Sequence, residues 1–270
     1  MEERLRSLFF TGNYPKVLES AQSSTAPQNL LLVIRSLLEY PSQKFPNIDS
    51  LQGIPHENVK LLERYLKKQI PATQLLENVN NDALGFGELI RGIVLINEGE
   101  PGQVIDSLKV SQVESYALVA SALLKLRRPD AAEALAKQGL EKDDEEGVLL
   151  FIEAIICIAK GEYDEAYSTL NELVQQYGES PALLNAIAIC TLQDANYEEA
   201  DMLLNKALEQ AKALSNSSLV STTLMNMIAF KRQQGLEVAE YENALREVRP
   251  DSDYFKLLNQ ASALFDSLVE

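Results

Sequence analysis

Apolar side chains recur along most of this chain at the three- and four-residue spacing that places them on one face of a helix. No alternating run of the length that a β-strand needs appears between them. The most apolar stretch is residues 148–159, where Glu153 is the only polar residue. A surface helix is apolar along one stripe, so a helix that is apolar nearly all round needs cover on more than one side. The pattern predicts an all-α protein whose helices pack against several neighbours.

A 34-residue period runs through the middle of the sequence. Tyr163 and Tyr197 stand at equivalent positions of this period. Small residues follow it in two series, Ala120, Ala154 and Ala188 in the first helix of each predicted pair, and Ala132, Ala166 and Ala200 near the start of the second. Alanines at these positions let two helix backbones approach closely, and the tyrosines can wedge between neighbouring pairs at the turns. We predict that these alanines and tyrosines pack the repeats together.

This period resembles that of the tetratricopeptide repeat, a pair of antiparallel helices that recurs every roughly 34 residues. The large aromatic residue and the glycine of that pattern are mostly replaced here, so the repeats are degenerate. We predict that residues 1–270 form a single α-solenoid of degenerate tetratricopeptide-like helix pairs. The repeats are clearest over 113–212, and further C-terminal helices follow over 217–270. A strong helix is also predicted from Gln28, ending before Pro41.

One side of each first helix lines the concave surface of such an array. Counting in register, the residues of that side are Phe151, Ile155, Ile158, Asn185, Ile189 and Leu192. Leaving the apolar ones in water would forgo roughly 1.5–3 kcal/mol each relative to burial. An apolar lining of this size indicates a lasting partner in the groove. Packing of the same side chains between adjacent helix pairs is the alternative that the sequence leaves open.

The net charge of the 270-residue chain is −16, which opposes binding to nucleic-acid phosphates and to anionic lipid surfaces. No apolar stretch reaches the about 20 residues that span a bilayer, and the N-terminus has no secretory signal core, so we expect a cytosolic protein. Cys157 and Cys190 lie in apolar helical stretches, and we expect both to be buried thiols. No cluster of histidines and cysteines suits a metal ion, so neither a metal nor another cofactor is expected.

Motifs for catalysis are missing from the sequence. It has neither a phosphate-binding P-loop nor a dinucleotide fingerprint after a strand. His56 is the single histidine, and nothing in its sequence surroundings indicates an orienting acid for a nucleophile. The acidic run 141–147 lacks the spacing of a calcium loop and is interpreted as a solvated turn. We therefore predict a binding protein rather than an enzyme.

Four segments of the chain resemble the epsilon subunit of coatomer, the COPI vesicle coat. They are "LFFTGNYPKVLESAQ" near the start, "ALVASALLKLRRPDAAEALAKQ" and "SPALLNAIAICTLQDANYEEADMLLNKALEQ" in the middle, and "ALFDSLV" at the end. The resemblance covers nearly the full length, and "LLNAIAICTLQ…YEEAD" is its most specific part.

The resemblance implies a non-enzymatic coat subunit. Its repeats would wrap around the C-terminal region of the alpha coatomer subunit and stabilise it, for Golgi-to-ER retrograde and intra-Golgi transport. The protein would be cytoplasmic and peripheral on Golgi membranes and COPI-coated vesicles, with membrane association only indirect through the coat.

Two other classes of function stay open at the level of sequence. One is another tetratricopeptide adaptor or co-chaperone scaffold, although the predicted groove lacks the cations that grip an acidic peptide tail. The other is an enzyme fused to a solenoid, which would need a polar pocket with a perturbed acid or base.

Overall fold

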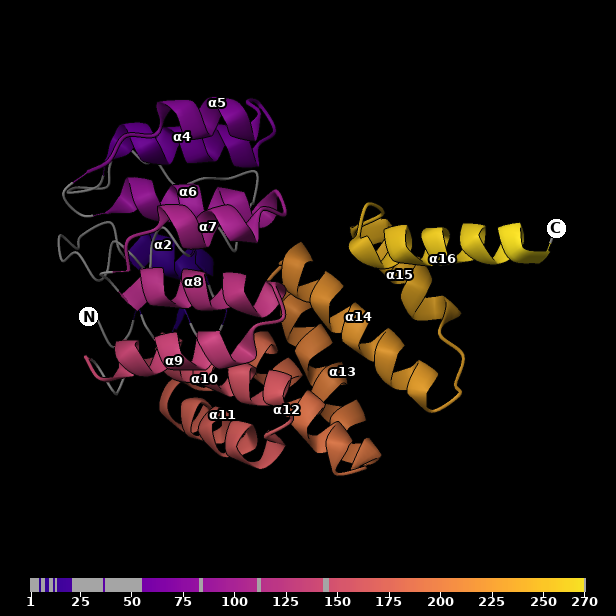
Figure 1. Ribbon diagram of the computed structural model, residues 1–270. Coiled ribbons are helices and arrows are strands. Elements are labelled where there is room, and N and C mark those ends of the chain that lie inside the picture. Colours follow the sequence, from indigo (N-terminus) through magenta and orange to yellow (C-terminus); the bar gives the residue numbers. More distant parts are fainter. Residues whose placement is uncertain are drawn as a thin grey trace. The chain divides into compact units, whose positions relative to one another are not determined.

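The computed structural model describes residues 5, 8–9, 12, 14–20, 36, 55–82, 85–110, 113–142 and 146–269. All regular secondary structure in these ranges is helical (Figure 1), so the prediction of an all-α protein is confirmed. None of these helices is both long and apolar enough to cross a bilayer. The helix predicted from Gln28 falls, apart from Ser36, outside the described residues.

Two compact units divide the chain, residues 1–179 and residues 180–270. The helices of the first unit are α2 (Tyr14–Ser20), α4 (His56–Leu66), α5 (Ala72–Asn78), α6 (Phe86–Asn97), α7 (Pro101–Ser107), α8 (Val113–Lys125), α9 (Pro129–Leu140), α10 (Gly147–Lys160) and α11 (Tyr163–Tyr177). Those of the second are α12 (Pro181–Gln193), α13 (Tyr197–Ala213), α14 (Ser217–Gln233), α15 (Ala239–Val248) and α16 (Asp253–Val269). That one uninterrupted solenoid spans 1–270 stays a prediction.

In the first unit, consecutive helices pack as pairs and the pairs pack on one another. The pairs are α4 with α5, α6 with α7, α8 with α9, and α10 with α11. Helix α6 also contacts α4 and α8, and α10 contacts both α8 and α9. Figure 1 shows these pairs as successive layers from α4 and α5 to α10 and α11. Nearest-neighbour packing of helix pairs is the arrangement of an α-solenoid, and it agrees with the predicted fold class.

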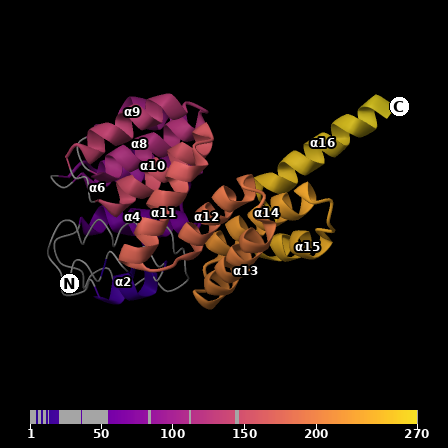
Figure 2. The ribbon, with the colours of Figure 1, turned by 90° about the horizontal axis from the view of Figure 1, so that it is seen from below.

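In the second unit, four helices pack in chain order and one extends from them. Helix α12 packs on α13, α13 on α14, and α14 on α15, and α12 also contacts α14. Ser180 and Asn216 cap α12 and α14, because their side-chain oxygens accept hydrogen bonds from Leu183 N at 3.2 Å and from Leu219 N at 3.1 Å. Helix α16 extends beyond α14 and α15 in both ribbon views (Figures 1 and 2).

The turn inside each helix pair has the same backbone design in three successive repeats. Arg127, Gly161 and Ala195 hold equivalent positions of the sequence period, and their φ angles are 57°, 85° and 56°. The N–H of the following residue donates back to a carbonyl in the last turn of the first helix, at 2.9, 2.8 and 3.1 Å respectively. This left-handed residue with its backward hydrogen bond is a Schellman-type helix end. The period read from the sequence is therefore also a period of the backbone.

Small residues lie in the cores of both units. The six alanines of the 34-residue period, Ala120, Ala132, Ala154, Ala166, Ala188 and Ala200, all have 0% of their surface exposed. In the first unit, Ala120 and Ala132 belong to a cluster with Leu123 and Ile156. In the second unit, Ala188 and Ala200 belong to a cluster with Leu204, Met227 and Phe230. Methyl side chains at these points leave room for the larger residues of neighbouring helices.

Polar contacts hold residues 80–82 of the segment before α6. Asn58 on α4 donates from Nδ2 to Asn80 O at 2.8 Å and accepts from Asn80 N at 3.0 Å. Asp82 accepts hydrogen bonds from the backbone N–H groups of Phe86 at 3.2 Å and Gly87 at 2.8 Å. A Cβ at Gly87 would lie 2.0 Å from Asn80 O, so only glycine fits this close approach.

Candidate partner-binding surface

Helix α10 carries the first half of the predicted groove lining, and its ends are well defined. The Glu146 side chain accepts a hydrogen bond from Val148 N at 3.5 Å, and Gly161 closes the helix in the left-handed conformation. The buried residues of α10 are Gly147, Val148, Leu149, Ala154 and Ile156. Helices α8, α9 and α11 all contact α10. These three neighbours explain why a helix can be apolar nearly all round.

Phe151, Ile155 and Ile158 form one stripe along α10, since they stand at positions i, i+4 and i+7. All three side chains are half-buried. Ile156 belongs to the core cluster built from α6 to α10, and Ile152 packs against that cluster. The stripe therefore keeps apolar surface in contact with water, as an interaction surface does. Its role as the lining of a partner groove stays a prediction.

Burial shifts the pKa values of two ionisable groups on α10. Burial raises the pKa of Glu153, and the nearby negative charges of Glu133 and Glu165 add to this while Lys137 opposes it. Burial, followed by the charge of Glu162, raises the pKa of the Cys157 thiol to about 11. In both groups burial disfavours the charged form, which is the expected effect of a low-dielectric surrounding.

A small ion-pair network joins α9 to the C-terminal end of α10. Glu133 accepts hydrogen bonds from Lys137 Nζ at 2.7 Å and from Lys160 Nζ at 2.9 Å. Lys160 also contacts Glu162 Oε1 at 2.7 Å. The two lysine hydrogen bonds lower the pKa of Glu133 to about 2. The network connects two helices that sequence analysis placed in different repeats, and it orients the end of α10 that follows Ile158.

In the second unit, Asn185 lies in a buried polar network between α12 and α14. Its side chain is 5% exposed. Nδ2 donates to Pro181 O at 2.7 Å and to Thr223 Oγ1 at 2.8 Å, while Oδ1 accepts from Asn226 Nδ2 at 2.8 Å. The amide is therefore already engaged inside this unit, and its predicted contact with a partner stays a prediction. Thr223 and Asn226 were not found from the sequence, because no periodic signal links them to Asn185.

Ile189 and Leu192, the other groove residues predicted on α12, are half-buried. Leu192 packs against the cluster formed by Ala188, Ala200 and Phe230. Ile189 is flanked along the helix by the fully buried Ala188 and Cys190. This part of α12 thus presents two partly covered apolar side chains on an otherwise buried helix. Their contact with a partner also stays a prediction.

The two repeat tyrosines stand at the first residue of their helices. Tyr163 begins α11 and is half-buried. Tyr197 begins α13, is 39% exposed, and stacks on Phe230 of α14 with ring centroids 6.3 Å apart. Tyr197 therefore contacts the helix pair that follows its own.

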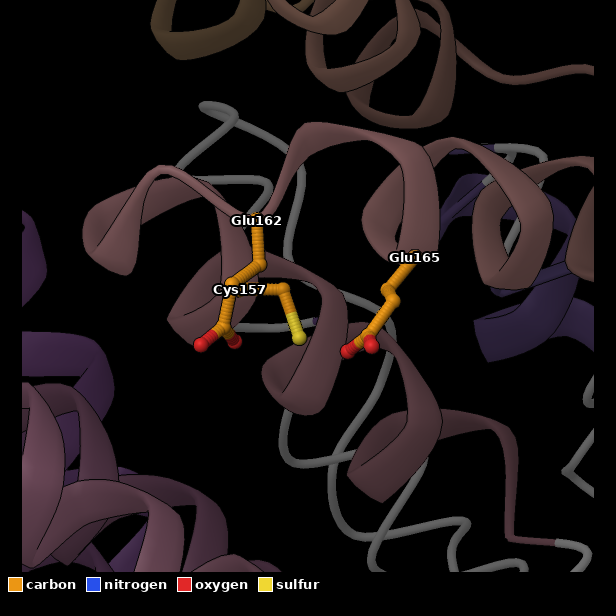
Figure 3. A group of neighbouring side chains, drawn as sticks. All are labelled: Cys157, Glu162 and Glu165. Carbon is orange, nitrogen blue, oxygen red and sulfur yellow. The ribbon is translucent and has the colours of Figure 1, made fainter.

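Cys157, Glu162 and Glu165 bring three potential metal-ligand atoms within 4.8 Å of one another (Figure 3). Lys160 Nζ already pairs with Glu162 Oε1 at 2.7 Å, and burial raises the pKa of the Cys157 thiol to about 11. Cys190, on α12, is buried and is in no disulfide with another described residue. His56, at the first residue of α4, has an Nδ1 atom with no hydrogen-bond partner in the described part of the chain. We assign no metal or catalytic centre to these groups.

Comparison with known proteins identifies one family. The sequence profile described as the coatomer epsilon subunit matches residues 4–270. The chain is 24% identical to coatomer subunit epsilon-2 of Arabidopsis thaliana over 283 aligned residues, covering 98% of this chain and 94% of the relative. It is also 24% identical to coatomer subunit epsilon-1 of Oryza sativa subsp. japonica, covering 98% and 96%. The coatomer subunit epsilon of Dictyostelium discoideum is 28% identical over 158 residues, covering 57% and 51%.

Proposed function

Because this chain belongs to the coatomer epsilon subunit family, we propose that it is a non-enzymatic subunit of the COPI vesicle coat that binds and stabilises the C-terminal region of the alpha coatomer subunit. In this role it supports Golgi-to-ER retrograde transport and transport within the Golgi. It acts from the cytoplasm, on Golgi membranes and COPI-coated vesicles, and reaches the membrane only through the coat.

The half-buried stripe of Phe151, Ile155 and Ile158 is the observation that supports this binding role. Three large apolar side chains that share one side of a helix stay partly in water. Burying the remaining apolar area of such residues on binding is favourable at about 25 cal/mol per Å². Binding of a permanent partner over the stripe would release this free energy, which the unbound subunit cannot gain.

The mode of binding follows from the character of the side chains. Ile189 and Leu192, which are predicted for the lining on α12 of the second unit, are apolar as well. Cationic residues are absent from the lining residues that we propose, so an acidic peptide tail finds no charge partner there. An apolar segment of a stable coat partner fits this surface better than a charged peptide that is captured transiently.

Co-expression with the C-terminal third of the alpha coatomer subunit tests this proposal. We expect a one-to-one complex in size-exclusion chromatography that survives raised salt, because apolar contacts are not screened by ions. Phe151→Asp and Ile155→Asp should each abolish the complex while circular dichroism stays helical. Leu126→Asp is the matched control, since Leu126 is 41% exposed in the same unit and lies outside the stripe.

Two results would contradict the proposal in different ways. Separate peaks from two well-folded proteins would exclude the alpha subunit as the partner and favour another tetratricopeptide adaptor role. Loss of helical signal in Phe151→Asp would show that the stripe belongs to the packing of the unit itself.

A further inference from the structure

Lys160 joins three helices of the first unit through one ammonium group. Its Nζ donates to Glu133 Oε2 of α9 at 2.9 Å and lies 2.7 Å from Oε1 of Glu162, the residue that precedes α11. Glu133 belongs to the preceding helix pair, so the contact crosses a repeat boundary. The side chains of Lys160 and Glu133 are only 20% and 28% exposed. A partly buried network of ion pairs is screened less than an isolated pair on the surface.

The surroundings of Lys160 are acidic, so its charge separates carboxylates that would otherwise repel one another. The negative charges of Glu133 and Glu165 both act on Glu153. Glu162, the second carboxylate that Lys160 binds, adds a fourth. Removing the charge of Lys160 would therefore leave α9 and the start of α11 repelling each other across the end of α10.

The same arrangement occurs in the second unit, at an equivalent place of the sequence period. Lys231 donates a hydrogen bond to Asp201, and Asp201 stands two 34-residue periods after Glu133. Lys160 and Lys231 both lie in the last turn of the first helix of a pair, and each binds an acid on the second helix of the preceding pair. This recurrence indicates that the contact fixes how one helix pair packs on the next.

Lys160 lies behind the stripe of Phe151, Ile155 and Ile158 and is not part of it. It stands nine residues after Phe151, which is about two and a half turns, so the two side chains leave the helix on opposite sides. Ile158, the last residue of the stripe, precedes Lys160 by two residues. A shift of this helix end relative to α9 would therefore move Ile158, although Lys160 faces away from a partner bound to the stripe.

We propose that Lys160 is a positioning residue for partner binding: it ties the last turn of α10 to α9 and to the start of α11, and it thereby aligns the stripe for the C-terminal region of the alpha coatomer subunit. This inference rests on the function proposed above. If the angle between the two helix pairs varied, the stripe would be aligned only part of the time, and the apparent affinity for the partner would fall in proportion.

Titration calorimetry of the full chain with the C-terminal region of the alpha subunit tests the inference. Lys160→Met keeps a long side chain without its charge, and it should weaken binding by about five-fold or more. Lys160→Arg should bind within about two-fold of the unchanged chain, because the charge is kept. Lys137→Met is the matched control, since Lys137 binds the other oxygen of Glu133 at 2.7 Å from within α9, and it should bind as the unchanged chain does.

Salt and hydrogen exchange separate positioning from general stability. High salt should weaken binding of the unchanged chain toward that of Lys160→Met and should change the affinity of Lys160→Met little, because ion pairs are screened and the apolar stripe is not. In the free chain, the amides of Gly161 and Glu162 at the end of α10 should exchange about three-fold faster or more in Lys160→Met. In Lys137→Met they should exchange as in the unchanged chain.

Three results would contradict the inference. Unchanged affinity of Lys160→Met, whatever its Tm, would overturn the positioning role and leave the proposed coat function standing. Equal losses of affinity in Lys160→Met and Lys137→Met would also overturn it, because they would trace the effect to Glu133 within α9. If the unchanged chain itself forms no complex, the proposed function fails and the positioning role fails with it.

Discussion

Gly161 and Ala195, which occupy equivalent positions in consecutive repeats, hold the same left-handed conformation at the end of the first helix of each pair, with φ angles of 85° and 56°. Glycine adopts this conformation freely, whereas a side chain with a Cβ pays about 1 kcal/mol for it. Glycine therefore suits this backbone turn better than alanine does, although both residues form it here.

Exchanging these residues should change stability in opposite directions. Ala195→Gly is expected to raise the free energy of unfolding by about 0.5–1 kcal/mol, since relief of the left-handed strain exceeds the added entropy of the unfolded chain. Gly161→Ala is expected to lower it by about 1 kcal/mol. Urea unfolding followed by circular dichroism measures both. If both substitutions changed the free energy of unfolding in the same direction, the two turns would not be equivalent.

The close approach of Gly87 to Asn80 gives a second prediction. Gly87→Ala should lower the free energy of unfolding by about 1–3 kcal/mol, because the new Cβ would lie 2.0 Å from Asn80 O and 3.3 Å from Asn58 Nδ2. Gly102→Ala in α7 is the matched control, since no atom lies within 4 Å of a Cβ there, and it should be neutral or slightly stabilising. A thermal melt of each variant provides the comparison, and an unchanged Tm for Gly87→Ala would contradict the close approach.

Sequence alone was sufficient for the fold class, because its main signals are local. The three- and four-residue apolar spacing predicts each helix, and the 34-residue period predicts how consecutive pairs are related. Arg127, Gly161 and Ala195 show this best, since their shared left-handed turn repeats with that period although the residue types differ. Ala195 alone would not have indicated a left-handed turn.

The features that sequence analysis missed depend on non-local contacts. Asn185 was assigned to a groove by its register, but its partners Thr223 and Asn226 are 38 and 41 residues away and carry no motif. The exposed face of α16, which includes Leu264 and Phe265, has the same apolar spacing as a core helix, so the pattern does not tell which neighbours are present. Only packing distinguishes a covered stripe from an uncovered one.

Asn185 offers a test of the buried network. Asn185→Leu should lower the free energy of unfolding by about 1–3 kcal/mol, because Thr223 Oγ1 and Asn226 Nδ2 lose a buried partner. Combining it with Thr223→Val should cost less than the sum of the two single changes, since the second removes a group already left without that partner. Asn205→Ala is the control, because the Asn205 side chain is exposed and donates from Nδ2 to Asp201 O of its own helix. Strict additivity in urea unfolding would show that Asn185 and Thr223 are not coupled.

The pH dependence of stability should separate Glu133 from Glu153, whose pKa values are shifted in opposite directions. Hydrogen bonds from Lys137 and Lys160 lower the folded-state pKa of Glu133 to about 2, from an ordinary value of 4.5. Its stabilising effect is therefore complete above pH 4.5 and is lost as the pH falls toward 2. Burial raises the pKa of Glu153, so its charged form opposes folding once the pH exceeds the ordinary value of 4.5.

Matched amide substitutions resolve the two contributions. Glu133→Gln should lower the Tm at pH 7, and the difference from the unchanged chain should be smaller at pH 3, where the unfolded chain already binds the proton. Glu153→Gln should raise the Tm at pH 7, because the neutral amide avoids the cost of partly burying a charge on α10. This gain should disappear at pH 3. Added salt should reduce the effect of Glu133→Gln more than that of Glu153→Gln, because Coulomb attraction between partly exposed groups is screened and the cost of burying a charge is not. If Glu153→Gln lowers the Tm at pH 7, the charged form of Glu153 contributes to the fold, and the assignment of α10 as an apolar surface is wrong at that position.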